Sequence, residues 1–202
     1  MEIISPGRTL VCQIANDDSN DKYLFPIGKV SPALEVKWKL KGCRDNGKLT
    51  VGGKALEGGV KLMDLCQGTV SRWKNRLAES TDVCKAGCDC HTVPFILSRT
   101  SFNDLASGKP IELNVLGEIA SYSPKKGRVT RTVDIDGQKT KVQCLQATGR
   151  AGKLWVTDDA QWPVLLRVEA GGGDTYSELL IISRLAPKEV EAQLGKAKDE
   201  DD

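Results

Sequence analysis

The chain has 202 residues, of which 40% are hydrophobic and 28% are charged, and its formal net charge is +2. This length accommodates one generous domain or two small ones, and the hydrophobic fraction is sufficient for a buried core. The nearly balanced charge argues against a nucleic-acid binder, which is strongly basic. No uninterrupted apolar run approaches the length of a transmembrane helix.

The first half of the chain contains patterns that are typical of short β-strands. We expect strands over Arg8–Ile14 and around residues 23–25. Residues Leu34–Leu40 alternate apolar and charged side chains, which predicts a half-buried strand with one face in water. Two further strands are expected over residues 47–51 and 60–66, each beside a pair of glycines.

One helix is marked at the middle of the chain. Ser98 is a suitable N-cap for a helix over Arg99–Ser107, because its hydroxyl can accept a hydrogen bond from the first turn. Gly108 suits the position after the helix, and Pro110 prevents the helix from continuing. A strand is expected to follow over residues 111–116.

The second half, from Arg128 to Ser183, contains apolar runs that recur about every ten residues, each closed by a turn signal. This spacing is typical of an antiparallel sandwich or barrel. Asp136-Gly137 predicts a type I′ hairpin, because that turn requires positive φ at both central residues. The predicted fold is therefore mainly β, an antiparallel sandwich or incomplete barrel with one or two short helices.

These patterns divide the chain into three parts. Residues 1–98 form a cysteine-containing, β-rich half, and residues 99–184 form a β-meander half with a short leading helix. Whether the two halves form one continuous domain is left open by the sequence. Residues 185–202 lack an apolar stripe and are highly charged, so we expect a disordered tail.

The cysteines predict disulfide bonds in the first half. Six of the seven lie within the first 90 residues, namely Cys12, Cys43, Cys66, Cys84, Cys88 and Cys90. Their even number predicts at least two disulfides, with connectivity left open. A zinc site is the less favoured alternative, because the soft ligands from Cys84 to His91 are crowded together without a second pair. Free thiols are the other alternative and are favoured over zinc. Cys144 is expected to be a buried, unpaired packing residue.

The start of the chain and its cysteine content bear on localisation. Residues 1–7 show neither the cationic start nor the apolar segment of a signal peptide. Seven cysteines nevertheless suit an oxidising compartment. Both observations agree if the sequence represents a mature exported domain, periplasmic or extracellular, from which the signal peptide is absent. A cytosolic protein with free thiols is the alternative.

His91 is the only histidine in the chain. Any Ser-His-Asp or Cys-His mechanism would therefore have to use it. The adjacent Cys90 is poorly placed for proton transfer, since neighbours on an extended chain point to opposite faces. We therefore expect a loop histidine and a protein that is not an enzyme, with no cofactor and no bound metal. A His91-dependent hydrolase is the least favoured alternative.

The four tryptophans stand out because the chain has few other aromatic residues. Trp162-Pro163 precedes an apolar strand, a position that suits the mouth of a pocket, although core packing is the simpler explanation. We take Trp38, Trp155, Trp162 and Leu166 as the candidate ligand-binding residues.

The run Leu154-Trp155-Val156-Thr157-Asp158-Asp159, followed by residues 162–168 (WPVLLRV), resembles a pattern in bacterial exported β proteins. It is similar to a hairpin of the LolA/LppX-like lipoprotein carriers, where the hairpin forms part of an incomplete barrel wrapped over helices. Residues 5–10 and 95–102 resemble pieces of uncharacterised exported bacterial proteins that share this hairpin. The resemblance covers about half of the chain and carries over no catalytic residue. The chain departs from the carriers in its cysteine-rich first half and in lacking their long helices.

Together these features predict a non-catalytic envelope or secreted protein that binds an apolar or amphipathic ligand on a concave β-sheet. The alternative is a protein–protein interaction module with a structural, adhesive or toxin-neutralising role. The expected partner is accordingly an apolar or amphipathic small molecule or another protein, and not a nucleic acid.

Overall fold

The computed structural model describes residues 3–15, 20–41, 46–59, 79–80, 95–115, 118–170 and 175–196. Within these ranges the protein is mainly β with three short helices. The strands are β1 (Thr9–Ala15), β2 (Asn20–Lys29), β3 (Leu34–Leu40), β4 (Asn46–Val51), β5 (Glu79–Ser80), β6 (Ile111–Val115), β7 (Glu118–Pro124), β8 (Val129–Ile135), β9 (Gln138–Gly149), β10 (Gly152–Thr157), β11 (Leu165–Ala170) and β12 (Tyr176–Ser183). The helices are α1 (Gly53–Gly58), α2 (Arg99–Ala106) and α3 (Pro187–Lys196).

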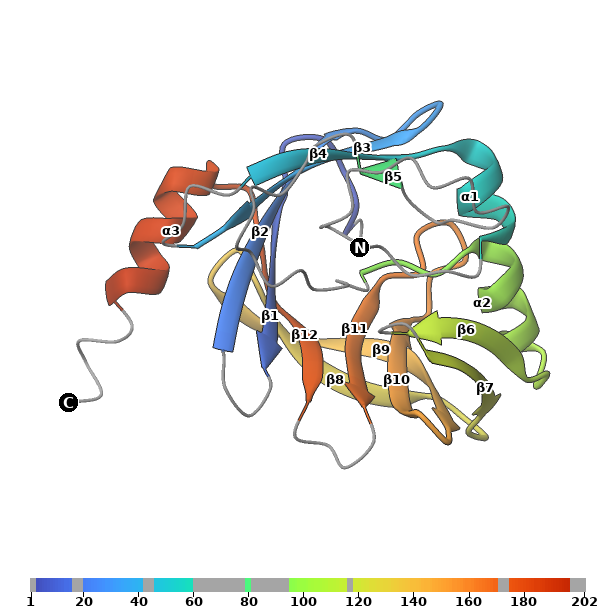
Figure 1. The fold of residues 1–202 in the computed structure, drawn as a ribbon. Helices are drawn as coiled ribbons and strands as arrows, with labels where there is room; N and C mark the ends of the chain where they lie inside the picture. Colours follow the sequence, from blue (N-terminus) through green and yellow to red (C-terminus); the bar gives the residue numbers. More distant parts are fainter. Residues whose placement is uncertain are drawn as a thin grey trace.

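All of these strands belong to one hydrogen-bonded sheet (Figure 1). Strands β8, β9, β10, β11 and β12 close into a ring, in which every pair is antiparallel except β8 with β12. Strands β1 to β5 extend the sheet from β12, and β7 and β6 extend it from β9. The predicted barrel is thus present as a closed five-stranded ring with further strands outside it.

Local signals in the sequence explain several of these elements. Asp136 and Gly137 have φ of 52° and 84°, so the predicted hairpin between β8 and β9 is confirmed. Ser98 accepts a hydrogen bond from the Ser101 amide at 3.3 Å, which confirms the cap of α2. Gly108 follows α2 with φ of 86°, a left-handed conformation that glycine adopts without strain.

The two halves of the chain share one core. β1 is paired along its length with β12, so the first and last strands are neighbours. The largest cluster of buried side chains contains Leu10 and Phe25 from the first half together with Cys144 and Leu179 from the second. The boundary near residue 98 therefore does not separate two cores.

The prediction that the charged tail is disordered is wrong for residues 187–196, because these residues form α3. Val190 and Leu194, four residues apart, are buried against Val11 and Leu24 on the outer side of the sheet. Lys39 binds Glu191 at 2.6 Å and adds a polar contact between the sheet and the helix. Two apolar side chains on one helical face are sufficient to hold α3 against the sheet, because the sheet supplies an apolar surface opposite them.

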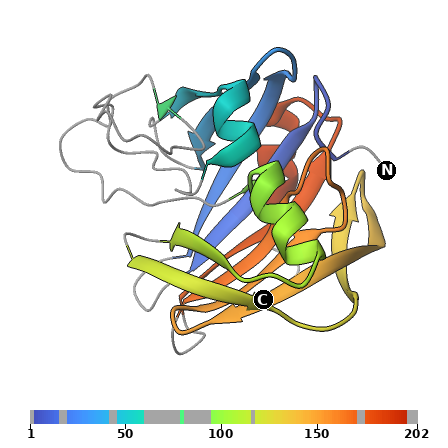
Figure 2. The ribbon, with the colours of Figure 1, turned by 90° about the vertical axis from the view of Figure 1, so that its right-hand side faces the viewer.

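Helix α1 was not expected from the sequence. It follows β4, whereas α2 precedes β6, and the two helices contact each other (Figure 2). Arg99 and Glu57 form an ion pair between them at 3.5 Å. None of the helices in the described ranges has both the length and the apolar character needed to cross a membrane.

Candidate functional site

One face of strands β1 to β4 is largely apolar or aromatic, with Asp21 opposite Ile14 at one end, and we call its buried apolar residues the inner face. Its members are Leu10, Cys12, Ile14, Tyr23, Phe25, Ile27, Leu34, Val36, Trp38, Leu49 and Val51. Each of these residues is at most 4% exposed. The inner face exists because alternate residues of each strand point to the same side of a sheet. The predicted strand over Leu34–Leu40 is confirmed, with its apolar side chains buried.

Aromatic rings form a continuous strip across this face. The ring of Phe25 stacks on Tyr23 with centroids 6.3 Å apart and on Phe95 with centroids 5.6 Å apart. Phe95 is fixed by its carbonyl oxygen, which accepts a hydrogen bond from the Leu165 amide at 3.0 Å. The strip therefore connects β2 with the start of β11.

Trp38 carries an unusual polar atom in this apolar environment. Its side chain is 3% exposed, and its indole nitrogen Nε1 has no hydrogen-bond partner among the described residues. Gly47 is the residue opposite Trp38 on β4, so no side chain faces the indole from that position. Leaving a buried donor without an acceptor costs about 1–3 kcal/mol.

The other three candidate residues lie in the same buried cluster as Trp38. Trp155 is 9% exposed, Trp162 is 5% exposed and Leu166 is 1% exposed. The guanidinium of Arg131 lies 4.9 Å from the Trp155 ring, and that of Arg99 lies 5.8 Å from the Trp162 ring. The structure thus brings the four residues into one core, and their contact with a ligand remains a prediction.

A cluster of ion pairs lies beside Trp155. Glu178 of β12 binds Arg131 of β8 at 2.6 Å and Arg167 of β11 at 2.8 Å. Arg167 also binds Glu169 at 2.8 Å. The sequence does not reveal this cluster, because its members come from separate strands that only the ring brings together. Its two cations and two anions neutralise one another, so it has no charge left for a ligand.

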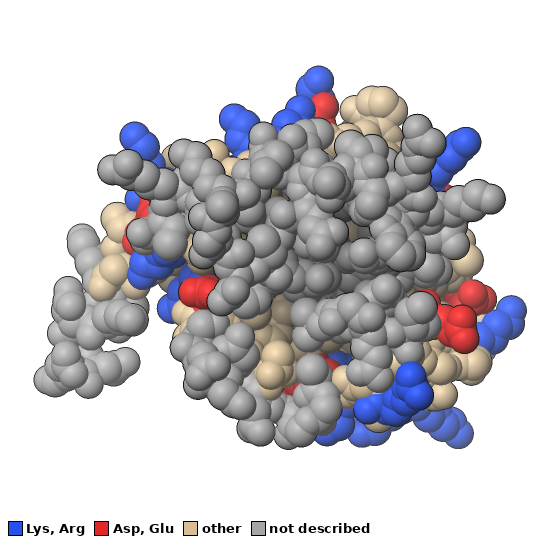
Figure 3. Space-filling model, in the orientation of Figure 1, with Lys and Arg blue, Asp and Glu red and all other residues tan. Residues whose placement is uncertain are grey.

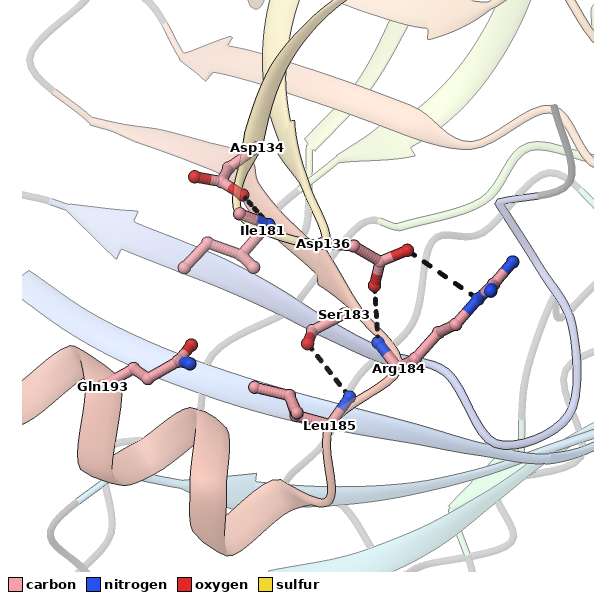
Figure 4. Close-up of a pocket in the computed structure, with 8 residues that line it drawn as sticks. Asp134, Asp136, Ile181, Ser183, Arg184, Leu185 and Gln193 are labelled. Carbon is pink, nitrogen blue, oxygen red and sulfur yellow. Dashed lines mark hydrogen bonds and ion pairs between the residues drawn. The ribbon is translucent and has the colours of Figure 1, made fainter.

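A pocket of about 380 Å³ lies between the β8–β9 turn, the end of β12 and α3 (Figure 4). Asp136 is its central side chain and accepts a hydrogen bond from the Arg184 amide at 2.8 Å. The same carboxylate forms ion pairs with Arg8 at 3.6 Å and with Arg184 at 3.7 Å. These internal contacts occupy the main charged group of the pocket.

The two cysteines in the described ranges, Cys12 and Cys144, are both free and buried. Burial raises the pKa of the Cys12 thiol to about 12 and that of the Cys144 thiol to about 11. The prediction that Cys144 is buried and unpaired is confirmed. The prediction that Cys12 forms a disulfide is wrong, because its thiol is free. Cys12 lies between Leu10 and Ile14 on the inner face, where a thiol packs like a small apolar side chain.

The remaining predictions about cysteine chemistry fall outside the described residues. These positions are Cys43, Cys66, Cys84, Cys88, Cys90 and His91. The expected disulfides, the alternative zinc site and the role of His91 therefore stay predictions.

Comparison of the chain with protein-family models, with curated proteins and with solved structures gives no match. The resemblance to the LolA/LppX-like carriers therefore remains a prediction.

Proposed function

We propose that the protein binds an apolar or amphipathic molecule against the inner face and that it acts without catalysis. The observation that supports this proposal is a curved sheet with a largely apolar face that contains one unpartnered donor. Trp155, Trp162 and Leu166 belong to the same cluster and are the expected neighbours of the ligand.

The outer surface gives less support to the alternative, an interaction module. Leu185 is the one large hydrophobic side chain that is exposed in the described part of the chain. In the view of Figure 3, the described rim of the molecule carries many Lys and Arg side chains with Asp and Glu among them. Partners that bind through a broad apolar patch find none on this described surface.

A matched pair of variants tests the proposal. Val36 and Val11 are both fully buried, but Val36 belongs to the inner face and Val11 packs against α3. Val36→Ala and Val11→Ala should lower the free energy of unfolding by similar amounts, on the order of 1–3 kcal/mol. Only Val36→Ala should also weaken binding of the neutral fluorescent probe N-phenyl-1-naphthylamine, measured by titration.

Native mass spectrometry after gentle purification provides the second measurement. A bound lipid-sized mass that organic extraction removes supports the proposal. The proposal fails if the wild-type protein neither retains such a mass nor binds the probe. A bound polypeptide or a discrete oligomer under those conditions would favour the interaction module instead.

A further inference from the structure

The charge of the chain is divided unevenly between two segments. Residues 119–157, from the second residue of β7 to the end of β10, contain eight Lys and Arg and two Asp, so their net charge is +6. Residues 199–202 are all acidic (DEDD) and contribute −4. Because the whole chain carries +2, the residues outside these two segments sum to zero. The excess positive charge of the protein therefore belongs to one part of the sheet.

Strand pairing brings four of these cations to one end of the sheet, which we call the basic tip. Its members are Lys125, Lys126, Arg150 and Lys153, and all four are exposed. Thr148 of β9 is opposite Ser123 at the end of β7 and also opposite Lys153 at the start of β10. The β7–β8 turn and the β9–β10 turn therefore lie side by side. In Figure 3, Lys and Arg side chains gather at the lower right, where Figure 1 shows these two turns.

Three lysines of the basic tip are available to a partner. Within the described ranges, no carboxylate lies at ion-pair distance from Lys125, Lys126 or Lys153. Other cations of the same segment are already paired, such as Arg128, which binds Asp158 at 2.7 Å. A partner with negative charge can therefore bind the three lysines without breaking an existing ion pair.

The surroundings of the basic tip favour an acidic polypeptide as the partner. Surfaces that bind membranes commonly combine cations with apolar side chains that enter the bilayer. The two turns instead contain Gly127 and Ala151, and the exposed large hydrophobic of the described chain, Leu185, follows β12. Nucleic acids select broadly basic proteins, whereas the rest of this chain is neutral or acidic.

Residues 199–202 are an acidic segment of suitable charge, but they start far from the basic tip of their own copy. They follow Lys196, the last residue of α3, by three positions. Figure 1 shows α3 and the two turns on opposite sides of the molecule. A globular chain of this length is about 40 Å across, whereas six extended residues span at most about 20 Å. The acidic segment can therefore reach the basic tip of another copy more readily than its own.

We propose that the basic tip binds residues 199–202 of a second copy of this chain, so that copies associate head to tail. The carboxylates accept charge-assisted hydrogen bonds from the lysine ammonium groups. Each copy uses two different surfaces, so the contact is heterologous and continues to further copies unless a ring closes. The inference concerns the outer surface and does not depend on ligand binding at the inner face.

Sedimentation velocity of the wild-type protein provides the first test. At about 10 mM ionic strength, where charges act over about 30 Å, the mean mass should rise with protein concentration. At about 1 M salt, where they act over about 3 Å, the protein should be monomeric. A protein that is monomeric under both conditions overturns the inference.

Two variants that complement each other test the direction of the contact. The tip variant carries Lys125→Glu, Lys126→Glu and Lys153→Glu, and the acid variant replaces the four acids of residues 199–202 by their amides. Each alone should be monomeric at low salt. An equimolar mixture should form a one-to-one dimer and nothing larger, because the tip variant keeps its acidic segment and the acid variant keeps its basic tip.

A matched control separates the basic tip from net charge. Lys37→Glu, Lys54→Glu and Lys188→Glu change the net charge as much as the tip variant does, at exposed lysines of other elements. This control should associate like the wild-type protein. Loss of association in the control, or a mixture of the tip and acid variants that stays monomeric, overturns the inference.

Cross-linking of the wild-type protein covers the case in which the tip variant does not fold. In a mixture of ¹⁴N- and ¹⁵N-labelled protein at low salt, a carbodiimide should join lysines of the basic tip to residues 199–202 of the other isotope, as mass spectrometry detects. Cross-links confined to single copies contradict the proposal. Binding of monomers to vesicles that contain phosphatidylglycerol, lost in the tip variant, would assign the basic tip to a membrane surface instead and overturn the inference.

Discussion

Gly149 of β9 is required by the close approach of β7. A Cβ atom at this position would collide with the carbonyl oxygen of Ser121 and lie 3.1 Å from Cδ1 of Tyr122. Because both neighbours are held in the sheet, Gly149→Ala should lower the free energy of unfolding by about 1–3 kcal/mol. Urea denaturation measures this loss. Gly195→Ala in α3 is the control, since its added methyl meets open space. This variant should raise the free energy of unfolding by up to about 1 kcal/mol, because alanine favours a helix more than glycine does.

The buried thiols make stability depend on alkaline pH. Burial raises the pKa of Cys12 to about 12, whereas an exposed thiol ionises near pH 9. Below pH 9 the thiol is protonated in both the folded and the unfolded chain, so its ionisation does not lower the free energy of unfolding. Between about pH 9 and pH 12 only the unfolded chain loses its proton, and stability should fall with increasing pH.

Cys12→Ala should reduce that alkaline loss, measured as the change of the urea midpoint with pH. Cys12 and Cys144 should also resist iodoacetamide in the native protein at pH 8 and react after unfolding, because the thiolate is the reactive form. Rapid native alkylation of Cys12 would contradict its burial.

At the scale of the element, helix α3 gives the clearest test of the structure, because the sequence predicts a disordered tail where the structure has a packed helix. Leu194→Ala should lower the free energy of unfolding by about 2–3 kcal/mol, since Leu194 packs on Val11 and Leu24. Leu185→Ala is the same substitution at an exposed site and should change it by less than about 0.5 kcal/mol. Hydrogen exchange in α3 as fast as in a free peptide would contradict the packing of the helix.

The elements that the sequence predicts well are those defined by local chemistry. Asp136-Gly137, the Ser98 cap and the alternation over Leu34–Leu40 each act within a few residues, so they are readable before the fold is known. Helices α1 and α3 were missed because each is stabilised by an apolar surface from a distant part of the chain. Val190 and Leu194 form a recognisable stripe only when Val11 and Leu24 lie opposite them.

The candidate site was also predictable only in part, because some of its features are visible in local sequence and others depend on how distant strands pair. Trp38, Trp155 and Trp162 were selected because aromatic residues are scarce, and all three lie in one buried cluster. The unpartnered state of Trp38 Nε1 depends on the register that places Gly47 opposite it. Neither that register nor the pairing of Glu178 with Arg131 and Arg167 is encoded in local sequence.

At the scale of the whole molecule, the ring and the sheet extension form a single architecture. The ring closes through a short parallel contact, Ile181 with Asp134 and Ile182 with Ile135. Parallel neighbours of this kind require a long connection, so turn signals between successive strands do not predict them. This explains why the sequence indicated an incomplete barrel and left the relation between the two halves open.

The pairing of β1 with β12 also has a consequence for biosynthesis. A ribosome completes β1 to β4 long before it reaches β12, whose Ser183 is the partner of Thr9. Until then β1 has one unpaired edge, and Cys12 and Leu10 lack their cross-strand neighbours Leu179 and Ile182. Exposed apolar surface and free strand edges promote association of nascent chains. The order of translation therefore leaves this strand edge and its apolar neighbours exposed until the final strand has emerged.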